Sequence, residues 1–246
     1  MKTSAFIGVI ITGLLLLLAI QDLPDWGATD SPANSNRLSK HYIEDSYDIT
    51  HVPNLVTTVL ADYRSHDTMF ETAVVFTAGV AILAILGVPG GGRPNRKEKA
   101  KPDVIVQSAC NLLIPVIQIF ALYVIAHGHI SPGGGFQGGV IFGASLILLA
   151  IAHDLPEAFK RLSEAKATML ASVGVLIYAG IGVLCMLLGG NFLDYDALVN
   201  IVPQLGYKDR YYGMLGIEIG VGITVAVVMF LIYASLSSRG EMEEGI

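Results

Sequence analysis

The chain has 246 residues, of which 53% are hydrophobic and only 15% are charged. Its mean hydropathy of +0.60 places it among integral membrane proteins and argues against an ordinary soluble domain. The net charge of −6 comes from acids between the apolar runs, and no nucleic-acid-binding motif is present, so we expect no nucleic-acid partner.

Six apolar runs are each close to the length of about 20 residues that crosses the hydrocarbon core of a bilayer. The predicted fold is therefore all-α, a polytopic integral membrane protein with about six transmembrane helices. The runs cover residues 4–20, 69–88, 104–126, 136–153, 167–188 and 214–236.

The first run, residues 4–20, has the positive start and short apolar core of a signal peptide, with Lys2 as the charge. No small-x-small cleavage site follows, because residues 19–22 read Ala-Ile-Gln-Asp. We therefore expect a retained first helix rather than a cleaved leader. Residues 21–39 are rich in Asp, Asn, Ser and Pro, and we expect an exposed outer loop there.

Residues 54–64 have the apolar spacing of an amphipathic helix. Its apolar positions recur at i, i+1, i+4, i+5 and i+8: Leu55, Val56, Val59, Leu60 and Tyr63. We predict an outer amphipathic helix that lies along the membrane interface. The alternative, a helix that covers its own bundle, stays open at this point.

The segment 59–78 resembles the C-terminal end of the large A subunit of Mrp-type Na+/H+ antiporters. There an Asp-aromatic-Arg and an Asp-Thr pair precede a helix that begins with Glu. The matching residues are Asp62, Tyr63, Arg64, Asp67, Thr68 and Glu71. A small separate subunit of archaeal hydrogenase-type complexes, the MbhE-like type, is similar. The resemblance implies that residues 1–90 are an MrpA C-terminal-like module with two transmembrane helices.

Glu71 is predicted about one turn into the second span. An ionisable side chain at membrane depth is costly, which favours a functional role. An acid in the first turn of a helix also complements the helix dipole, so a structural role competes. The resemblance implies a part in proton or ion transfer, because Glu71 occupies the position of an acid associated with transport.

A basic Gly/Pro linker, residues 91–102, separates this module from residues 103–246. Lys and Arg counts in the loops predict that the linker and both termini are cytoplasmic, since ten basic residues then lie inside and five outside. The linker charge also suits contact with anionic membrane lipid.

The third span carries amides on one face. Gln107, Asn111 and Gln118 lie at i, i+4 and i+11, and we expect them to join helices by hydrogen bonds or to line a hydrated path. His127 and His129 follow the span at its outer end. A histidine there can relay protons near neutral pH or hydrogen-bond within an interface.

The most distinctive stretch is 127–139, which has five glycines in seven residues. Gly135, Gly139 and Gly143 form a doubled small-xxx-small pattern that lets one helix backbone lie against another. We predict a helix–helix contact centred on Gly139. The run itself comprises Pro132, Gly133, Gly134, Gly135, Phe136, Gln137, Gly138 and Gly139. Phe136 is expected to fill a pocket on an adjacent helix or subunit.

This stretch, followed by an apolar helix, resembles the B subunit of multisubunit Mrp-type antiporters. The same family supplies a membrane subunit to related respiratory complexes, including membrane-bound hydrogenases. The resemblance covers residues 101–235 and implies that residues 103–246 are an MrpB-like (MnhB-like) module with four transmembrane helices.

Glu218 is the third candidate acid or base within a span. Gly216 and Gly220 flank it, so its helix is expected to pack closely on a neighbour. Its predicted depth is only one to two turns, so a side chain that reaches to the interface competes with an ion-transfer role.

Together these features predict a membrane subunit of a multisubunit Na+/H+ antiporter, free-standing or part of a hydrogenase-like respiratory complex, which contributes to ion translocation and assembly. The expected partners are other Mrp-type subunits, with or without a redox module. Na+ and H+ are the transported species.

Cys110 and Cys185 lie in apolar runs far from other ligands, so no cofactor, metal or catalytic site is expected here. A structural scaffold without an ion path, or a self-contained transporter, are the alternatives. The latter predicts internal repeats, which we do not find.

Overall fold

The computed structural model describes residues 2–35, 37–86, 104–201 and 208–238. These residues form helices joined by turns, and the chain divides into two compact units, residues 1–45 and 46–246. Five helices are long and apolar enough to cross a membrane, and α1 adds a shorter apolar stretch, Ala5–Ile20. The predicted all-α polytopic membrane fold is therefore confirmed.

The first unit contains α1 (Lys2–Ile20), α2 (Pro32–Ser35) and α3 (Arg37–Glu44). The leucines of α1 at positions 14–18 are each 56–62% exposed. A helix that is apolar on all sides and this exposed suits a lipid environment or a partner helix.

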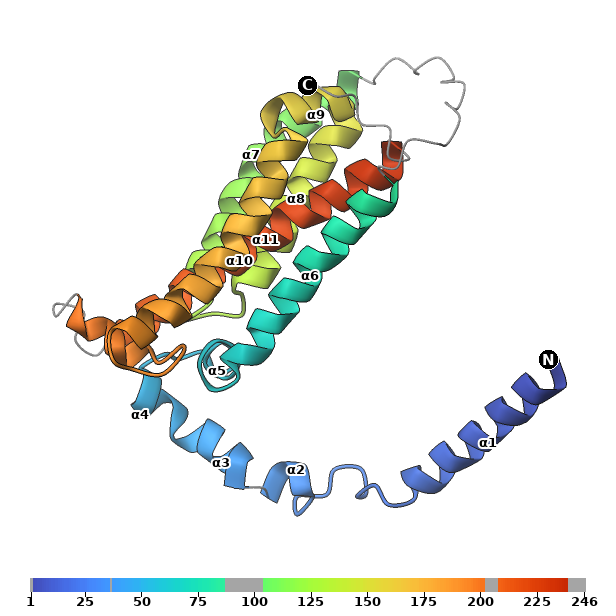
Figure 1. The fold of residues 1–246 in the computed structure, drawn as a ribbon, viewed down its shortest axis with the longest axis vertical. Helices are drawn as coiled ribbons and strands as arrows, with labels where there is room; N and C mark the ends of the chain where they lie inside the picture. Colours follow the sequence, from blue (N-terminus) through green and yellow to red (C-terminus); the bar gives the residue numbers. More distant parts are fainter. Residues whose placement is uncertain (1, 36, 87–103, 202–207, 239–246) are drawn as a thin grey trace. The chain divides into compact units, whose positions relative to one another are not determined.

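The second unit is a bundle around α11 (Asp209–Ser238), which contacts α6 (Ser65–Leu86), α8 (Gly135–His153) and α10 (Glu164–Leu187). Figure 1 shows α11 in red among these helices. On the outside of α8 lies α7 (Val104–Ala126). The remaining elements are short: α4 (Ser46–Thr50), α5 (Leu55–Thr58), the π-helix η1 (Val59–Tyr63), α9 (Leu155–Arg161) and the 3-10 helix η2 (Tyr195–Asn200).

Small residues set the spacing between the central helices. A Cβ atom on Gly139 of α8 would lie 2.7 Å from the Gly222 carbonyl oxygen of α11, and one on Gly143 would lie 2.8 Å from the Ala226 carbonyl oxygen. Gly174 of α10 and Gly220 of α11 face each other in the same way. α11 therefore touches its neighbours backbone to backbone, as small-xxx-small spacing allows.

Two of the spanning helices begin about one turn earlier than the predicted apolar runs. α6 begins at Ser65 rather than Met69, and α11 begins at Asp209 rather than Met214. Each added turn is polar and carries an acid, which complements the positive end of the helix dipole. Hydropathy alone places such a turn in the preceding loop. The linker predicted at residues 91–102 lies outside the described residues, and the module boundary stays a prediction.

The segment predicted as one amphipathic helix consists of α5 and η1. Its threonines face the protein: Thr57 is 3% exposed and Thr58 is fully buried, whereas Val56 is 59% exposed. Of the predicted apolar positions, Val56 and Leu60 are exposed, whereas Leu55, Val59 and Tyr63 are half-buried.

Polar contacts fasten this segment to the C-terminal half. Arg210 at the start of α11 binds Asp62 of η1 through Nη1 at 2.8 Å and Asp196 of η2 through Nη2 at 2.6 Å. The fully buried Tyr195 donates a hydrogen bond to the Ala61 carbonyl at 2.8 Å. Residues on both sides of the predicted linker thus form one folded unit.

Candidate functional site

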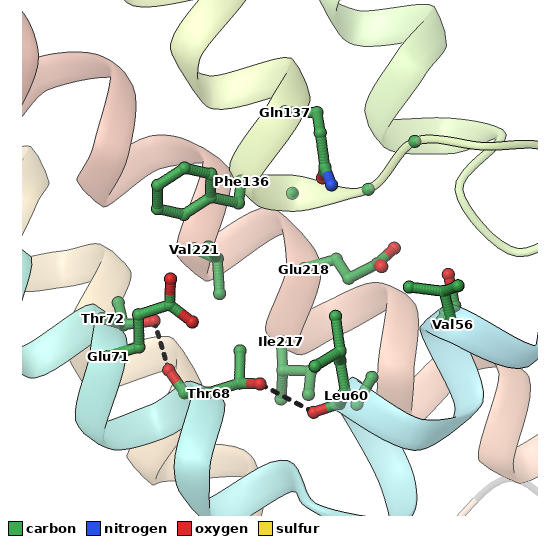
Figure 2. A pocket seen from close by; sticks show the side chains of 15 residues that line it. Val56, Leu60, Thr68, Glu71, Thr72, Phe136, Gln137, Ile217, Glu218 and Val221 are labelled. Carbon is green, nitrogen blue, oxygen red and sulfur yellow. Dashed lines mark hydrogen bonds between the residues drawn. The ribbon is translucent and has the colours of Figure 1, made fainter. Parts of the chain in front are cut away.

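A cavity of about 160 Å³ lies between the segments on either side of the linker. It is lined from α5, η1, α6, the glycine run and α11, and Figure 2 shows its main side chains. Two acids singled out from the sequence, Glu71 on α6 and Glu218 on α11, both line it, as do Gly133, Gly134, Gly135, Phe136 and Gln137. The fold thus brings together residues from both predicted modules.

Glu218 is enclosed by glycine backbone. A Cβ atom on Gly134 would lie 2.9 Å from its Oε1, and one on Gly128 would lie 3.2 Å from its Oε2. Gly135 lies so close to the Glu218 backbone that a Cβ atom there would overlap the carbonyl oxygen. Any side chain at these positions would meet the glutamate, which explains why this part of the run consists of glycine.

The carboxylate is buried inside the bundle. Glu218 is only 8% exposed, and Oε2 has no hydrogen-bond partner among the described residues. Its nearest oppositely charged candidate is His129, whose Nδ1 lies 3.6 Å from Oε2. A buried carboxyl group with so few hydrogen-bond or ion-pair partners is costly to ionise. Ionisable side chains of this kind within membrane spans are by default candidates for proton or ion transfer.

His129 is fully buried, and its ring centroid lies 4.3 Å from that of Tyr211. Burial lowers the pKa of its imidazole to about 4, although the backbone of Tyr211 acts in the opposite direction. A lowered pKa favours the neutral ring, so at neutral pH His129 is an uncharged imidazole rather than an imidazolium.

The loop that carries His129 is fixed by two residues from the N-terminal half. Asn54 Nδ2 donates to the carbonyl oxygens of Gly128 at 2.7 Å and Ser131 at 3.0 Å. The Asn54 backbone N–H donates to the His129 carbonyl at 3.0 Å. Thr57 Oγ1 donates to the Gly128 carbonyl at 2.6 Å.

Glu71 occupies a different part of the cavity. It lies in the second turn of α6 between Thr68, which donates to the Leu60 carbonyl at 2.8 Å, and Thr72, which donates to the Thr68 carbonyl at 2.8 Å. The residue is exposed, unlike Glu218. In Figure 2 the Glu218 carboxylate points away from Glu71, so a proton that passes between them needs water in the cavity.

Other predicted residues lie elsewhere. His127 stacks on Tyr123 with ring centroids 4.1 Å apart. Of the α7 amides, Asn111 contacts His153 of α8, with 2.8 Å between Oδ1 and Nε2. Gln107 and Gln118 are half-buried on the same helix. Asn111 therefore joins α7 to α8, and none of the three amides lines the cavity.

The glycines of α8 pack against two neighbouring helices, α11 and α7. Gly139 and Gly143 face α11, whereas a Cβ atom on Gly138 would overlap Ile125 of α7. Pro132 is exposed, and Phe136 is 39% exposed at the cavity. The described chain leaves one side of Phe136 uncovered.

Sequence reasoning missed Asn54, Thr57 and Tyr211. Asn54 carries one local signal, because it precedes α5 as an N-cap whose side chain accepts from the Val56 N–H at 3.0 Å. Its longer contacts, to residues more than 70 positions away, leave no local pattern.

Residues 105–231, just over half of the chain, match the family model described as a domain related to the MnhB subunit of Na+/H+ antiporter. A putative antiporter subunit mnhB2 of Staphylococcus epidermidis is 34% identical over 137 residues, which cover 55% of this chain and 94% of that protein. The B subunit of a Na+/H+ antiporter of Bacillus subtilis is 32% identical over 135 residues, 53% of this chain and 94% of that protein.

Two solved structures share the fold over nearly the whole chain. One belongs to the membrane-bound sulfane sulfur reductase, an archaeal respiratory membrane complex, with a TM-score of 0.66, 25% identity and coverage of 94% of this chain and 97% of that one. The other belongs to the Mrp complex from Dietzia sp., with a TM-score of 0.70, 22% identity and coverage of 99% of this chain and 26% of that one.

Proposed function

The chain belongs to the family of domains related to the MnhB subunit of Na+/H+ antiporters, and from this premise we propose that Glu218 and His129 form a proton-transfer step. The chain is a multi-pass membrane subunit of an Mrp-type antiporter module, and it is homologous to a subunit of an archaeal respiratory membrane complex. The observation that carries the proposal is the buried Glu218 oxygen, 3.6 Å from the imidazole of a fully buried histidine.

The two side chains suit a short transfer. Glu218 is the donor when protonated, and the neutral imidazole of His129 is the acceptor. Because burial lowers the pKa of His129, the imidazolium is a short-lived intermediate that must pass its proton on or return it to Glu218. The 3.6 Å separation is slightly longer than a hydrogen bond, so a small movement of either side chain brings them into contact.

Glu71 is the proposed entry to this step. Glu71 is exposed and Glu218 is buried, and both line the same cavity. An acid in this position can exchange protons or attract Na+ from the surroundings and pass protons inward through water. His127 stacks on α7 and is assigned no step of its own.

We further propose that residues 1–90 are an MrpA C-terminal-like, MbhE-like module fused to the MrpB-like module. The curated relatives align with just over half of this chain, whereas the sulfane sulfur reductase chain matches almost its entire length. The fold match to a quarter of a longer Mrp chain also supports the view that both pieces occur together in one polypeptide.

Other Mrp-type subunits complete the ion path in this proposal, and any redox chemistry belongs to separate subunits. Both termini are cytoplasmic. Exchange of Na+ for H+ takes place in the assembled complex, because the described cavity is short and does not form a continuous route across the bundle.

The test is Na+-driven proton movement in vesicles that contain the assembled complex. Glu218→Gln and Glu71→Gln keep the size of each side chain but cannot titrate. We expect normal co-purification of the other subunits and a loss of exchange of about 100-fold or more for Glu218→Gln, since a positioned proton-transfer group contributes roughly 10²–10⁴. Glu157→Gln on α9, where Lys160 pairs with Glu157 at 2.9 Å, is the matched control. Full exchange by an assembled Glu218→Gln complex would favour the scaffold alternative.

A further inference from the structure

We propose that Asn54 is the positioning residue of this site, because it holds the loop that carries His129 and thereby fixes the imidazole against Glu218. The inference rests on the proton-transfer step proposed above. It assigns to the N-terminal half of the chain a direct part in the geometry of that step.

Asn54 binds three carbonyl groups of one short loop. Its side-chain amide donates to Gly128 and Ser131, and its backbone N–H donates to His129. These carbonyls lie between the last residue of α7 and the first residue of α8, so neither helix supplies them with partners. Irregular backbone at membrane depth is tolerated only where neighbouring protein satisfies it, and Asn54 does so here.

Thr57 reinforces the same contact. Its hydroxyl is the second donor to the Gly128 carbonyl, so both lone pairs of that oxygen are used. Thr57 is 3% exposed. On the opposite side, Gly128 touches Gly134 and the Glu218 carboxylate, as a Cβ atom there would lie 2.7 Å and 3.2 Å from them. The loop is therefore held between Asn54 and Thr57 on one side and Glu218 on the other.

Loosening this loop has a defined chemical consequence for His129. The titratable groups that face its ring are Glu218 and Tyr211, both on α11, and its neighbour in the loop is His127. The residues facing the loop from the other side, Asn54 and Thr57, carry no charge. A freed ring gains water while keeping Glu218 nearby, and both effects favour the imidazolium. As pH is lowered, the neutral imidazole that accepts the proton is then lost at a higher pH than in the parent protein.

The decisive variant is Asn54→Ser, measured in the assembled complex in vesicles. Serine still caps α5, but it is too short to reach the two loop carbonyls. We expect exchange below that of the parent already at about pH 8, because the imidazole is less well aimed at Glu218. Between about pH 8 and about pH 6 we expect a further, roughly fourfold fall, because a histidine with the ordinary pKa of ~6.5 is about one quarter neutral at the lower pH. The parent, in which burial holds the pKa of His129 at about 4, should lose little exchange over this range.

Thr57→Val tests the same loop with a side chain of equal size and should shift the profile in the same direction. Asn200→Ser is the matched control, since Asn200 Nδ2 also donates to a loop carbonyl, that of Leu188 at 3.3 Å, but at η2. An unchanged pH profile in Asn54→Ser and Thr57→Val, alongside loss of exchange in Glu218→Gln, would overturn the positioning role alone. Failure of both variants to assemble would assign Asn54 a purely structural role. Normal exchange by Glu218→Gln would instead remove the proposed function itself.

Discussion

At the scale of single residues, the absence of side chains is what accommodates Glu218. Gly128, Gly134 and Gly135 together leave a space that a glutamate can occupy next to backbone. Gly134 has a second constraint, because its φ of +138° lies in a region that residues with a side chain rarely adopt. One residue thus meets both a conformational and a steric requirement.

These two requirements can be separated by a matched pair of variants. Gly134→Ala introduces backbone strain and a methyl group 2.9 Å from Glu218 Oε1. Gly189→Ala introduces comparable strain at φ +90° but has no atom within 4 Å of the new methyl group. We expect both to lower the melting temperature of the complex, with a strain cost of about 1–3 kcal/mol each. Only Gly134→Ala should also reduce Na+/H+ exchange. Equal exchange in the two variants would contradict the proposed role of this glycine.

At the scale of helices, the contact between α8 and α11 determines how the bundle closes. The three glycines at i, i+4 and i+8 place α8 directly on the backbone of α11 near Gly222 and Ala226. At these glycines the contact depends on close approach and van der Waals packing. Farther along the two helices, Leu146 and Leu149 of α8 pack with Phe230 of α11 in one buried cluster.

Gly139→Leu should open this contact. The new side chain would begin 2.7 Å from the Gly222 carbonyl oxygen, and overpacking of this kind costs typically about 1–3 kcal/mol. We expect less of this subunit in the purified complex and a parallel fall in exchange. Gly180→Leu is the control, because Gly180 lies within α10 with no atom within 4 Å of its Cβ position. If both variants assemble equally well, α8 does not require the close approach.

The ion pairs of Arg210, which join α11 to η1 and η2, predict how stability depends on pH. Burial raises the pKa of Asp62 above its usual range, although Arg210 acts against this shift. The folded protein therefore binds the proton of Asp62 more tightly than the unfolded chain does, and stability falls as pH rises from the ordinary pKa to the raised one. Arg210→Gln removes the opposing cation and raises the pKa of Asp62 further, so the melting temperature of the variant should keep falling to a higher pH than that of the parent.

A measurement of melting temperature against pH in detergent checks this expectation. Lys160→Gln, which breaks an exposed pair on α9, is the control and should leave the pH dependence unchanged. A pH dependence in Arg210→Gln identical to that of the parent would mean that Asp62 does not need its guanidinium partner.

The sequence predicts the spans and the helix contacts better than it predicts the site. Apolar length alone finds α6, α7, α8, α10 and α11, and glycine spacing identifies the face of α8 that meets α11. Local patterns could not show that Glu71 and Glu218 share a cavity, since 147 positions of chain separate them. Nor could they show that Thr57 faces inward, because its orientation follows from a carbonyl at Gly128.

At the scale of the whole molecule, the distribution of basic residues predicts that residues 91–102 are cytoplasmic. A cysteine introduced by Asn95→Cys should therefore resist impermeant thiol reagents applied to intact cells and react in inverted vesicles. The native Cys110 and Cys185 are 6% and 0% exposed, so the parent protein provides a low background. Ready labelling in intact cells would reverse the orientation of every span.

The contacts across the linker also bear on how such a protein could be divided between genes. Asn54 binds the loop after α7, Tyr195 binds Ala61, and Arg210 binds Asp62, so the two halves recognise each other through several independent polar contacts as well as the packing of α6 on α11. None of these contacts depends on the peptide bonds between residues 91 and 102. Cutting the chain there should leave two polypeptides that assemble as a pair, and covalent fusion then mainly guarantees equal amounts of both.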